Sequence, residues 1–214
     1  MKGVKVKICG ITNPEDARWA ANFGADFVGI NFCRQSPRHV SLDMAGQIAG
    51  ALPGFVKAVG VLADASEEEI ARVLKKVNLA VLQLHGSETP EFARSLKERT
   101  GLEVWKAVRV ESEASLRDIP AYSGAVDAVL LDAHVPGLLG GSGTAFDWGL
   151  AARAKDSGIP VILAGGLTPE NVEEAVKKAA PAIVDTAGGV EKDGHPRKKD
   201  PDKMKSFILK AKGA

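Results

Sequence analysis

Short apolar runs alternate with amphipathic segments along the whole chain. Each run is rich in β-branched residues and is followed by Gly, Pro or polar residues, then by a segment with helical periodicity. Such runs are typical of parallel strands buried on both faces. We predict eight strands, over Val4–Ile8, Phe27–Asn31, Val56–Leu62, Ala80–Leu84, Val104–Val108, Ala128–Leu131, Pro160–Leu163 and Ala182–Thr186.

Helix-start signals occupy the gaps between these strands. A capping residue followed by proline occurs at Asn13-Pro14, Thr89-Pro90 and Thr168-Pro169, and Ser66 to Glu69 has the spacing of a capping box. We also predict a helix from Ser41 or Asp43 to Ala51, a weaker one over Ser112–Asp118, a short one over Trp148–Lys155 and a closing helix over Pro201–Lys212.

Eight strand–helix units in 214 residues predict one α/β domain, a (β/α)8 TIM barrel over residues 1–214. A doubly wound open sheet obeys the same right-handed crossover rule and is the structural alternative. The number of units favours the barrel. So does Cys9-Gly10-Ile11-Thr12 after the first strand, where a dinucleotide-binding sheet would carry GxGxxG.

Composition narrows the range of partners. The formal net charge is +1, which gives no electrostatic reason to expect binding to nucleic acid or to an anionic membrane. The basic run Arg197-Lys198-Lys199 lies beside Asp200, and we interpret it as a solvated loop. No apolar stretch has the length of a membrane span and no signal-peptide core follows Met1, so we expect a cytoplasmic protein.

The chain has two cysteines, Cys9 and Cys33, which form no CxxC pair. A reducing compartment argues against a disulfide between them. Two cysteines and four histidines in this spacing also fall short of a structural zinc site. The sequence leaves open whether the protein is a monomer or a homodimer.

In a TIM barrel, reactive side chains come from the carboxyl ends of the strands and the loops that follow. This rule selects Cys9, Arg38, His85 and Asp132. On position alone, Cys9 fits a small buried hydrophobe as well as a functional thiol, and His85 fits packing or ligand positioning as well as proton transfer. Asp132 ends an apolar run, where a carboxylate needs a partner or a function. Arg38 has a planar fork suited to a substrate carboxylate.

Two glycine pairs, Gly165-Gly166 and Gly188-Gly189, follow the seventh and eighth predicted strands. Glycine lets the backbone approach a ligand closely, and loops at these two places commonly bind phosphate through backbone N–H groups. Tight turns without a ligand are the alternative. The occurrence of two pairs in adjacent loops favours the phosphate site.

Strand alternation places Lys5, Lys7 and Cys9 on one face of the first strand and its apolar residues on the other. If the apolar face packs on the helices, Lys7 points into the barrel below Cys9 and needs an anionic partner. Asp185 on the eighth strand is the expected partner, and the charge of Lys7 is expected to favour the Cys9 thiolate. The alternative leaves both lysines at the solvated rim.

Several short motifs follow one another at the ends of the predicted strands: Val6-Lys7-Ile8-Cys9-Gly10-Ile11-Thr12, Ser36-Pro37-Arg38, Gln83-Leu84-His85-Gly86, Leu130-Leu131-Asp132 with Gly140-Gly141-Ser142-Gly143, Ala164-Gly165-Gly166-Leu167, Gly189-Val190-Glu191 and Lys198-Lys199-Asp200. In this order they resemble the phosphoribosylanthranilate isomerase family over the whole chain. The first motif and the stretch from Asp132 to Trp148 are the most specific parts.

The resemblance implies an Amadori rearrangement of N-(5-phosphoribosyl)anthranilate to 1-(2-carboxyphenylamino)-1-deoxyribulose 5-phosphate. Asp132 matches the general acid that opens the ribose ring, Cys9 the general base that removes the C2 proton, and Arg38 the group that holds the anthranilate carboxylate. We add His85, Asp185, Gly165, Gly166, Gly188 and Gly189 as substrate-binding candidates. The iminium nitrogen acts as the electron sink, so no metal or other cofactor is implied. The acid and the base would need pKa values displaced toward neutrality from opposite sides.

One departure from the family pattern bears on the phosphate. The last loop reads Thr186-Ala187-Gly188 where the family commonly has two serines, so we expect weaker or rearranged phosphate binding through backbone N–H groups. The alternatives are another sugar-phosphate isomerase and a catalytically silent phosphosugar-binding barrel. The related histidine-pathway isomerase uses aspartates after strands one and five, where this chain has Cys9 and Arg109.

Overall fold

Eight parallel strands close into a barrel in sequence order, with β8 paired to β1. The structure is a computed structural model that describes residues 3–133 and 148–214. Its barrel strands are β1 (Lys5–Ile8), β2 (Phe27–Asn31), β3 (Lys57–Leu62), β4 (Val81–Leu84), β5 (Glu103–Val110), β6 (Ala128–Ala133), β7 (Val161–Leu163) and β8 (Ile183–Thr186). Because β1 is hydrogen-bonded to both β2 and β8, the predicted barrel is confirmed and the open sheet is excluded.

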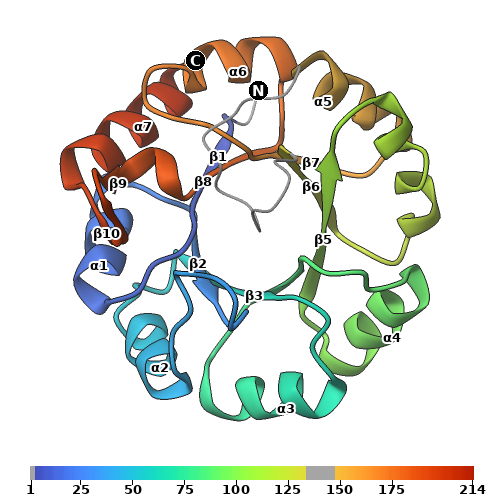
Figure 1. Ribbon diagram of the computed structural model, residues 1–214, viewed down its shortest axis with the longest axis horizontal. Helices are drawn as coiled ribbons and strands as arrows, with labels where there is room; N and C mark the ends of the chain where they lie inside the picture. Colours follow the sequence, from blue (N-terminus) through green and yellow to red (C-terminus); the bar gives the residue numbers. More distant parts are fainter. Residues whose placement is uncertain (1–2, 134–147) are drawn as a thin grey trace.

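Helices surround the barrel as an outer ring, as Figure 1 shows in a view along the barrel. They are α1 (Pro14–Phe23), α2 (Leu42–Gly50), α3 (Glu67–Lys76), α4 (Pro90–Thr100), α5 (Trp148–Ala154), α6 (Val172–Ala179) and α7 (Pro201–Gly213). Several begin at the predicted caps. Asn13 accepts a hydrogen bond from the N–H of Asp16, and Ser66 and Glu69 form the reciprocal bonds of a capping box.

The strands divide the apolar core into two layers. Val6 and Ile8 of β1 pack outward in the layer that contains the helices, as the alternation of β1 predicts. A second cluster includes Phe27, Trp105 and Ile162 and fills the barrel interior. The rings of Phe27 and Trp105 meet edge to face with their centroids 5.0 Å apart. These side chains fill the interior of the barrel, and its carboxyl-terminal mouth is left for a site.

Two helix predictions need correction. The crossover after β5 contains two short 3-10 turns, Glu113–Leu116 and Ile119–Tyr122, in place of the predicted helix over Ser112–Asp118. There the Ser115 hydroxyl accepts from the N–H groups of residues 111 and 112, which favours a turn over a continued helix. After β7 the chain forms a turn, and α6 begins only at Val172, because the Asn171 side chain accepts from the N–H of Thr168.

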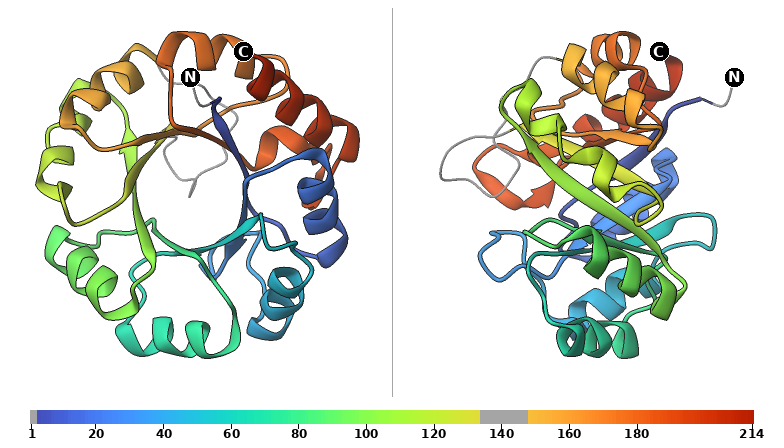
Figure 2. Two further views of the ribbon diagram at one scale, coloured as in Figure 1. Left: turned by 180° about the vertical axis from the view of Figure 1, so that it is seen from behind. Right: turned by 90° about the vertical axis from the view of Figure 1, so that its right-hand side faces the viewer.

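The basic run is not the solvated loop that we expected. It belongs to an antiparallel hairpin of β9 (Glu191–Lys192) and β10 (His195–Lys199), which follows a 3-10 turn over Gly188–Val190. Figure 1 shows the hairpin outside the barrel, beside α1 and α7. In the side view of Figure 2 its orange-red ribbon lies at the end of the barrel away from the start of β1, which is dark blue. Arg197 and Lys198 are exposed, but Lys199 is buried with 1% of its surface accessible.

Candidate active site

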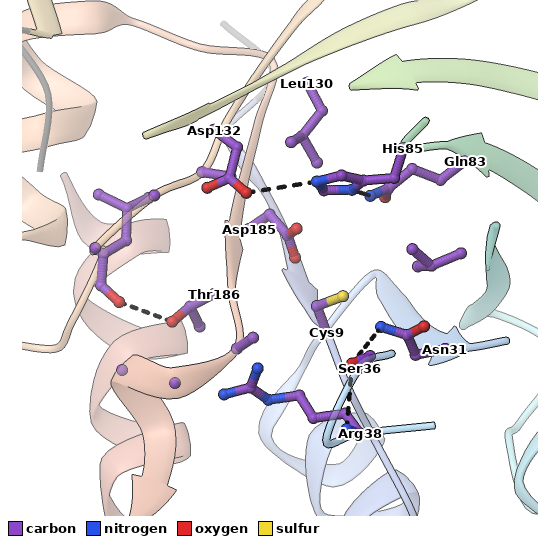
Figure 3. Close-up of a pocket in the computed structure, with 18 of the residues that line it drawn as sticks. Cys9, Asn31, Ser36, Arg38, Gln83, His85, Leu130, Asp132, Asp185 and Thr186 are labelled. Carbon is purple, nitrogen blue, oxygen red and sulfur yellow. Dashed lines mark hydrogen bonds and ion pairs between the residues drawn. The ribbon is translucent and has the colours of Figure 1, made fainter. Parts of the chain in front are cut away.

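A pocket of about 870 Å³, including the part open to solvent, occupies the mouth of the barrel. This volume lies in the range of ligand-binding clefts. The candidates that sequence analysis selected all line it: Cys9, Arg38, His85, Asp132, Gly165, Gly166, Asp185, Gly188 and Gly189. Figure 3 shows their arrangement, with Cys9 and Asp185 between Arg38 on one side and the pair of Asp132 and His85 on the other. The predicted site residues therefore come together in one cavity.

Cys9 follows β1 directly, and the absence of a side chain on Gly29 makes room for it. A Cβ atom on Gly29 would lie 2.8 Å from Cys9 Sγ and 3.2 Å from Lys7 Cε. Burial raises the pKa of the Cys9 thiol, and Asp185 raises it further, while Lys7 and Lys199 act to lower it. The sign of the predicted Lys7 effect is thus confirmed. Desolvation of the sulfur outweighs the ammonium, so the pKa of the thiol is raised on balance.

Lys7 points into the barrel, as predicted, and its Nζ lies 2.9 Å from Asp185 Oδ2. The parallel pairing of β1 with β8 sets the two residues directly opposite each other. Burial alone would lower the pKa of Lys7, but Asp185 and Cys9 together raise it above its ordinary value. Asp185 Oδ1 is buried without a hydrogen-bond partner, so this oxygen is available to a polar group in the pocket.

Asp132 lies near the end of β6 and is buried, with its side chain 7% exposed. Its Oδ2 is 3.5 Å from His85 Nε2, which is longer than an ordinary hydrogen bond. On its other side His85 Nδ1 lies 3.2 Å from the Gln83 amide nitrogen. An amide nitrogen only donates, so this contact leaves the proton of neutral His85 on Nε2, which faces Asp132.

The loops that carry the two glycine pairs meet in one wall of the pocket. Gly165 and Gly166 have φ values of 78° and 68°, in the left-handed region that favours glycine. A Cβ atom on Gly189 would lie 2.0 Å from the carbonyl oxygen of Leu167, so the loops pack too closely for a side chain there. The hydroxyl of Thr186 donates to the same carbonyl at 2.7 Å and is thereby committed to joining the loops.

Arg38 extends from the segment after β2 into the pocket, where Glu191 already holds it. Arg38 Nε and Nη2 donate to the two carboxylate oxygens of Glu191, both at 2.7 Å. The hydrogen bonds to Glu191 are the main reason that the pKa of Arg38 is raised. Its Nη1 group makes neither of these bonds, so part of the fork remains for a ligand.

Sequence reasoning missed three side chains of this region. Gln83 is buried beside His85, and Glu191 and Lys199 form the ion cluster behind Arg38. Strand alternation could have found Gln83, because it lies on β4 two positions before His85, which follows the strand. Nothing in a run of three basic residues distinguishes the buried Lys199 from its exposed neighbours. The motif Gly140-Gly141-Ser142-Gly143 lies outside the described residues.

Within residues 3–133 and 148–214, no helix has the length and apolar character needed to cross a membrane. Nor do they contain a group of three or more His, Cys, Asp or Glu side chains that could hold a metal ion.

Comparison with known proteins agrees with this geometry. The family model for N-(5'-phosphoribosyl)anthranilate isomerase matches residues 6–210. A protein of that name from Trichlorobacter lovleyi is 44% identical over 211 residues, covering 99% of both chains. The crystal structure of the Thermotoga maritima isomerase superposes with a TM-score of 0.90 at 42% identity, covering 99% of this chain and 100% of that one.

A further solved isomerase, in complex with reduced 1-(o-carboxyphenylamino)-1-deoxyribulose 5-phosphate, has a TM-score of 0.87 and 40% identity, with 99% of this chain and 100% of that chain covered. The match thus extends over nearly the full length of the barrel and includes both loops that supply Cys9 and Arg38. By sequence and by fold, this chain belongs to the phosphoribosylanthranilate isomerase family.

Proposed function

We propose that this chain catalyses the Amadori rearrangement of N-(5-phosphoribosyl)anthranilate to 1-(2-carboxyphenylamino)-1-deoxyribulose 5-phosphate, a step of tryptophan biosynthesis. The observation that carries the proposal is the presence of Cys9 and Asp132 in one pocket with two glycine loops and an arginine. An acid, a base, a phosphate cradle and a carboxylate receptor are the groups that this reaction requires.

Asp132 acts as the general acid. It protonates the ring oxygen of the ribose, the C1–O bond breaks, and an iminium ion forms between C1 and the anthranilate nitrogen. His85 Nε2–H faces the carboxylate that Asp132 becomes and stabilises the charge that develops there. Cys9 then removes the proton from C2 as a thiolate, and the electron pair moves to the iminium nitrogen. The resulting enolamine tautomerises to the ketone.

The two ends of the substrate carry negative charge and bind at different walls. The phosphate lies against the backbone N–H groups of the Gly165-Gly166 and Gly188-Gly189 loops. Arg38 binds the anthranilate carboxylate through the part of its fork that Glu191 leaves free. Asp185 Oδ1 accepts a hydrogen bond from a sugar hydroxyl between them.

The chemistry is complete with protein side chains and the substrate nitrogen, so the proposal includes no cofactor and no metal. The chain acts in the cytoplasm on a small phosphoribosyl substrate, as a monomer or a homodimer, without nucleic acid or a membrane as partner. Sedimentation velocity at several protein concentrations distinguishes the two oligomeric states.

Turnover of N-(5-phosphoribosyl)anthranilate, followed by chromatographic detection of the ketose product, tests the activity. Conversion by the wild-type chain supports the proposal. Binding of substrate without conversion would instead identify a silent phosphosugar-binding barrel. Faster conversion of the aldose substrate of the histidine pathway would identify the other sugar-phosphate isomerase.

A further inference from the structure

The β9–β10 hairpin contacts Arg38 from two directions, although it lies outside the barrel. Glu191 begins the hairpin and Lys199 ends it, and the two residues are paired in the register of the ladder. Between them stands Arg197, on the exposed part of β10. These residues are the ones through which the hairpin reaches the mouth of the barrel.

The first contact is ionic and buried. One Glu191 carboxylate binds the Arg38 fork with both oxygens and also receives Lys199 Nζ at 3.1 Å. The side chains of Arg38, Glu191 and Lys199 are only 11%, 8% and 0% exposed. Two basic groups therefore share one carboxylate, and burial lowers the pKa of the Lys199 amine.

The second contact holds the backbone on either side of Arg38. Arg197 Nη1 donates to the carbonyl oxygen of Pro37 at 2.7 Å and to that of His39 at 2.9 Å. The aliphatic part of Arg38 lies where a Cβ atom on Gly10 would be, 2.3 Å from Arg38 Cδ. The guanidinium is thus fixed at its base, along its stem and at one edge of its fork.

The same cluster reaches the glycine loop. Lys199 Nζ donates to the carbonyl oxygen of Ala187 at 2.9 Å, immediately before Gly188. Lys199 therefore links Glu191, the anion that orients Arg38, to the loop that carries Gly188. A shift of the hairpin would move the arginine and this loop together.

We infer that Glu191 is the positioning residue for recognition of the substrate carboxylate, with Arg197 and Lys199 supporting it. Glu191 occupies Nε and one hydrogen of Nη2, so the remaining donors of the fork face the pocket in one orientation. A pre-oriented fork binds a carboxylate without first losing the rotamer freedom of a long side chain. The inference rests on the proposed function, because it assumes that Arg38 binds the carboxyl group on the aryl ring of the substrate.

Two probes separate carboxylate recognition from binding of the rest of the molecule. One is reduced 1-(o-carboxyphenylamino)-1-deoxyribulose 5-phosphate, and the other is the same compound without the ring carboxyl group. Calorimetry gives a dissociation constant for each, and their ratio is the carboxylate preference of a variant. Arg38→Ala defines the preference that remains without the guanidinium.

Glu191→Gln keeps the size of the side chain and removes its charge. We expect the carboxylate preference to fall about tenfold, the scale of one charge-assisted hydrogen bond, with affinity for the second probe much less affected. An unchanged preference would overturn the inference, because a merely structural role would weaken both probes alike. A higher preference would also overturn it, since Glu191 would then compete with the ligand for Arg38.

Arg197→Ala repeats the test without disturbing buried charge, because Arg197 is exposed. Its carboxylate preference should fall several-fold, while that of the adjacent exposed variant Lys198→Ala should equal the wild-type value. If Glu191→Gln does not fold, equal values for Arg197→Ala and Lys198→Ala overturn the inference. The proposed function fails separately, if wild-type protein neither converts the substrate nor binds either probe.

Discussion

At the scale of single residues, Cys9, the proposed base, lies where its charged form is disfavoured. Desolvation raises the pKa of its thiol. For a base this is a cost, which Lys7 and Lys199 reduce but do not cancel.

Loss of either proton-transfer group should stop turnover without preventing binding. We expect Cys9→Ala and Asp132→Asn each to lower kcat by on the order of 10²- to 10⁴-fold, the usual range for general acid–base catalysis. The dissociation constant of the reduced product analogue should change far less. Asp156→Asn, which alters an exposed carboxylate in the turn after α5, is the matched control. Nearly full turnover in either variant would contradict the role proposed for that residue.

The charge state of Cys9 can be measured by the pH dependence of alkylation in a Cys33→Ala background, where Cys9 is the one remaining cysteine. Because its pKa is raised, the fraction of thiolate at a given pH is lower than for a free thiol, and the profile should shift to higher pH. Lys7→Met removes an opposing charge and should shift the profile further in the same direction. A profile that is unchanged by Lys7→Met would show that the ammonium does not act on the sulfur.

At the scale of elements, the loops after β7 and β8 function as one unit. Gly189 packs against Leu167 so closely that a methyl group there would force the two loops apart. We expect Gly189→Ala to raise KM and the inhibition constant of inorganic phosphate about ten- to a hundredfold, as displacement of a binding loop does. Gly54→Ala, where a Cβ atom meets nothing within 4 Å, should leave both constants unchanged. Equal constants in the two variants would place the phosphate elsewhere.

The barrel strands and most helices could be predicted because their signals are local. A buried parallel strand is an apolar run, and a capped helix start occupies a few adjacent residues, as at Asn13 and Ser66. The first 3-10 turn after β5 could not be predicted as reliably, because serine is also compatible with a helix and the sequence does not show that the Ser115 hydroxyl bonds back to residue 111. The burial of Lys199 was not predicted, because its partner Glu191 is brought to it by the hairpin turn.

In the candidate site too, local signals could be predicted and contacts between distant residues could not. Position at a strand end was sufficient to find Cys9, His85 and Asp132, because barrel geometry brings all carboxyl ends together. It could not show that Arg38 is bound by Glu191, or that burial raises the pKa of the Cys9 thiol. Those properties depend on distances between side chains that are far apart along the chain.

At the scale of the whole molecule, the Lys7–Asp185 pair lies across the seam where the last strand meets the first. The two side chains are buried, with 0% and 7% of their surfaces exposed. Taking two charges out of water costs free energy, which the attraction between them offsets only when both are present. Removal of one of the two charges should therefore destabilise the fold far more than replacement of both by apolar side chains.

A double-variant cycle measures this. Lys7→Met leaves a buried carboxylate unpaired, and we expect it to lower the free energy of unfolding by about 3–5 kcal/mol in urea denaturation. Asp185→Leu should cost a similar amount, whereas the combined variant should recover most of the loss, because it buries no charge at all. The exposed pair of Lys57 and Glu103 is the control, where Lys57→Met should cost no more than about 1 kcal/mol. Additive losses in the combined Lys7→Met and Asp185→Leu variant would show that the two charges do not depend on each other, and would contradict this expectation.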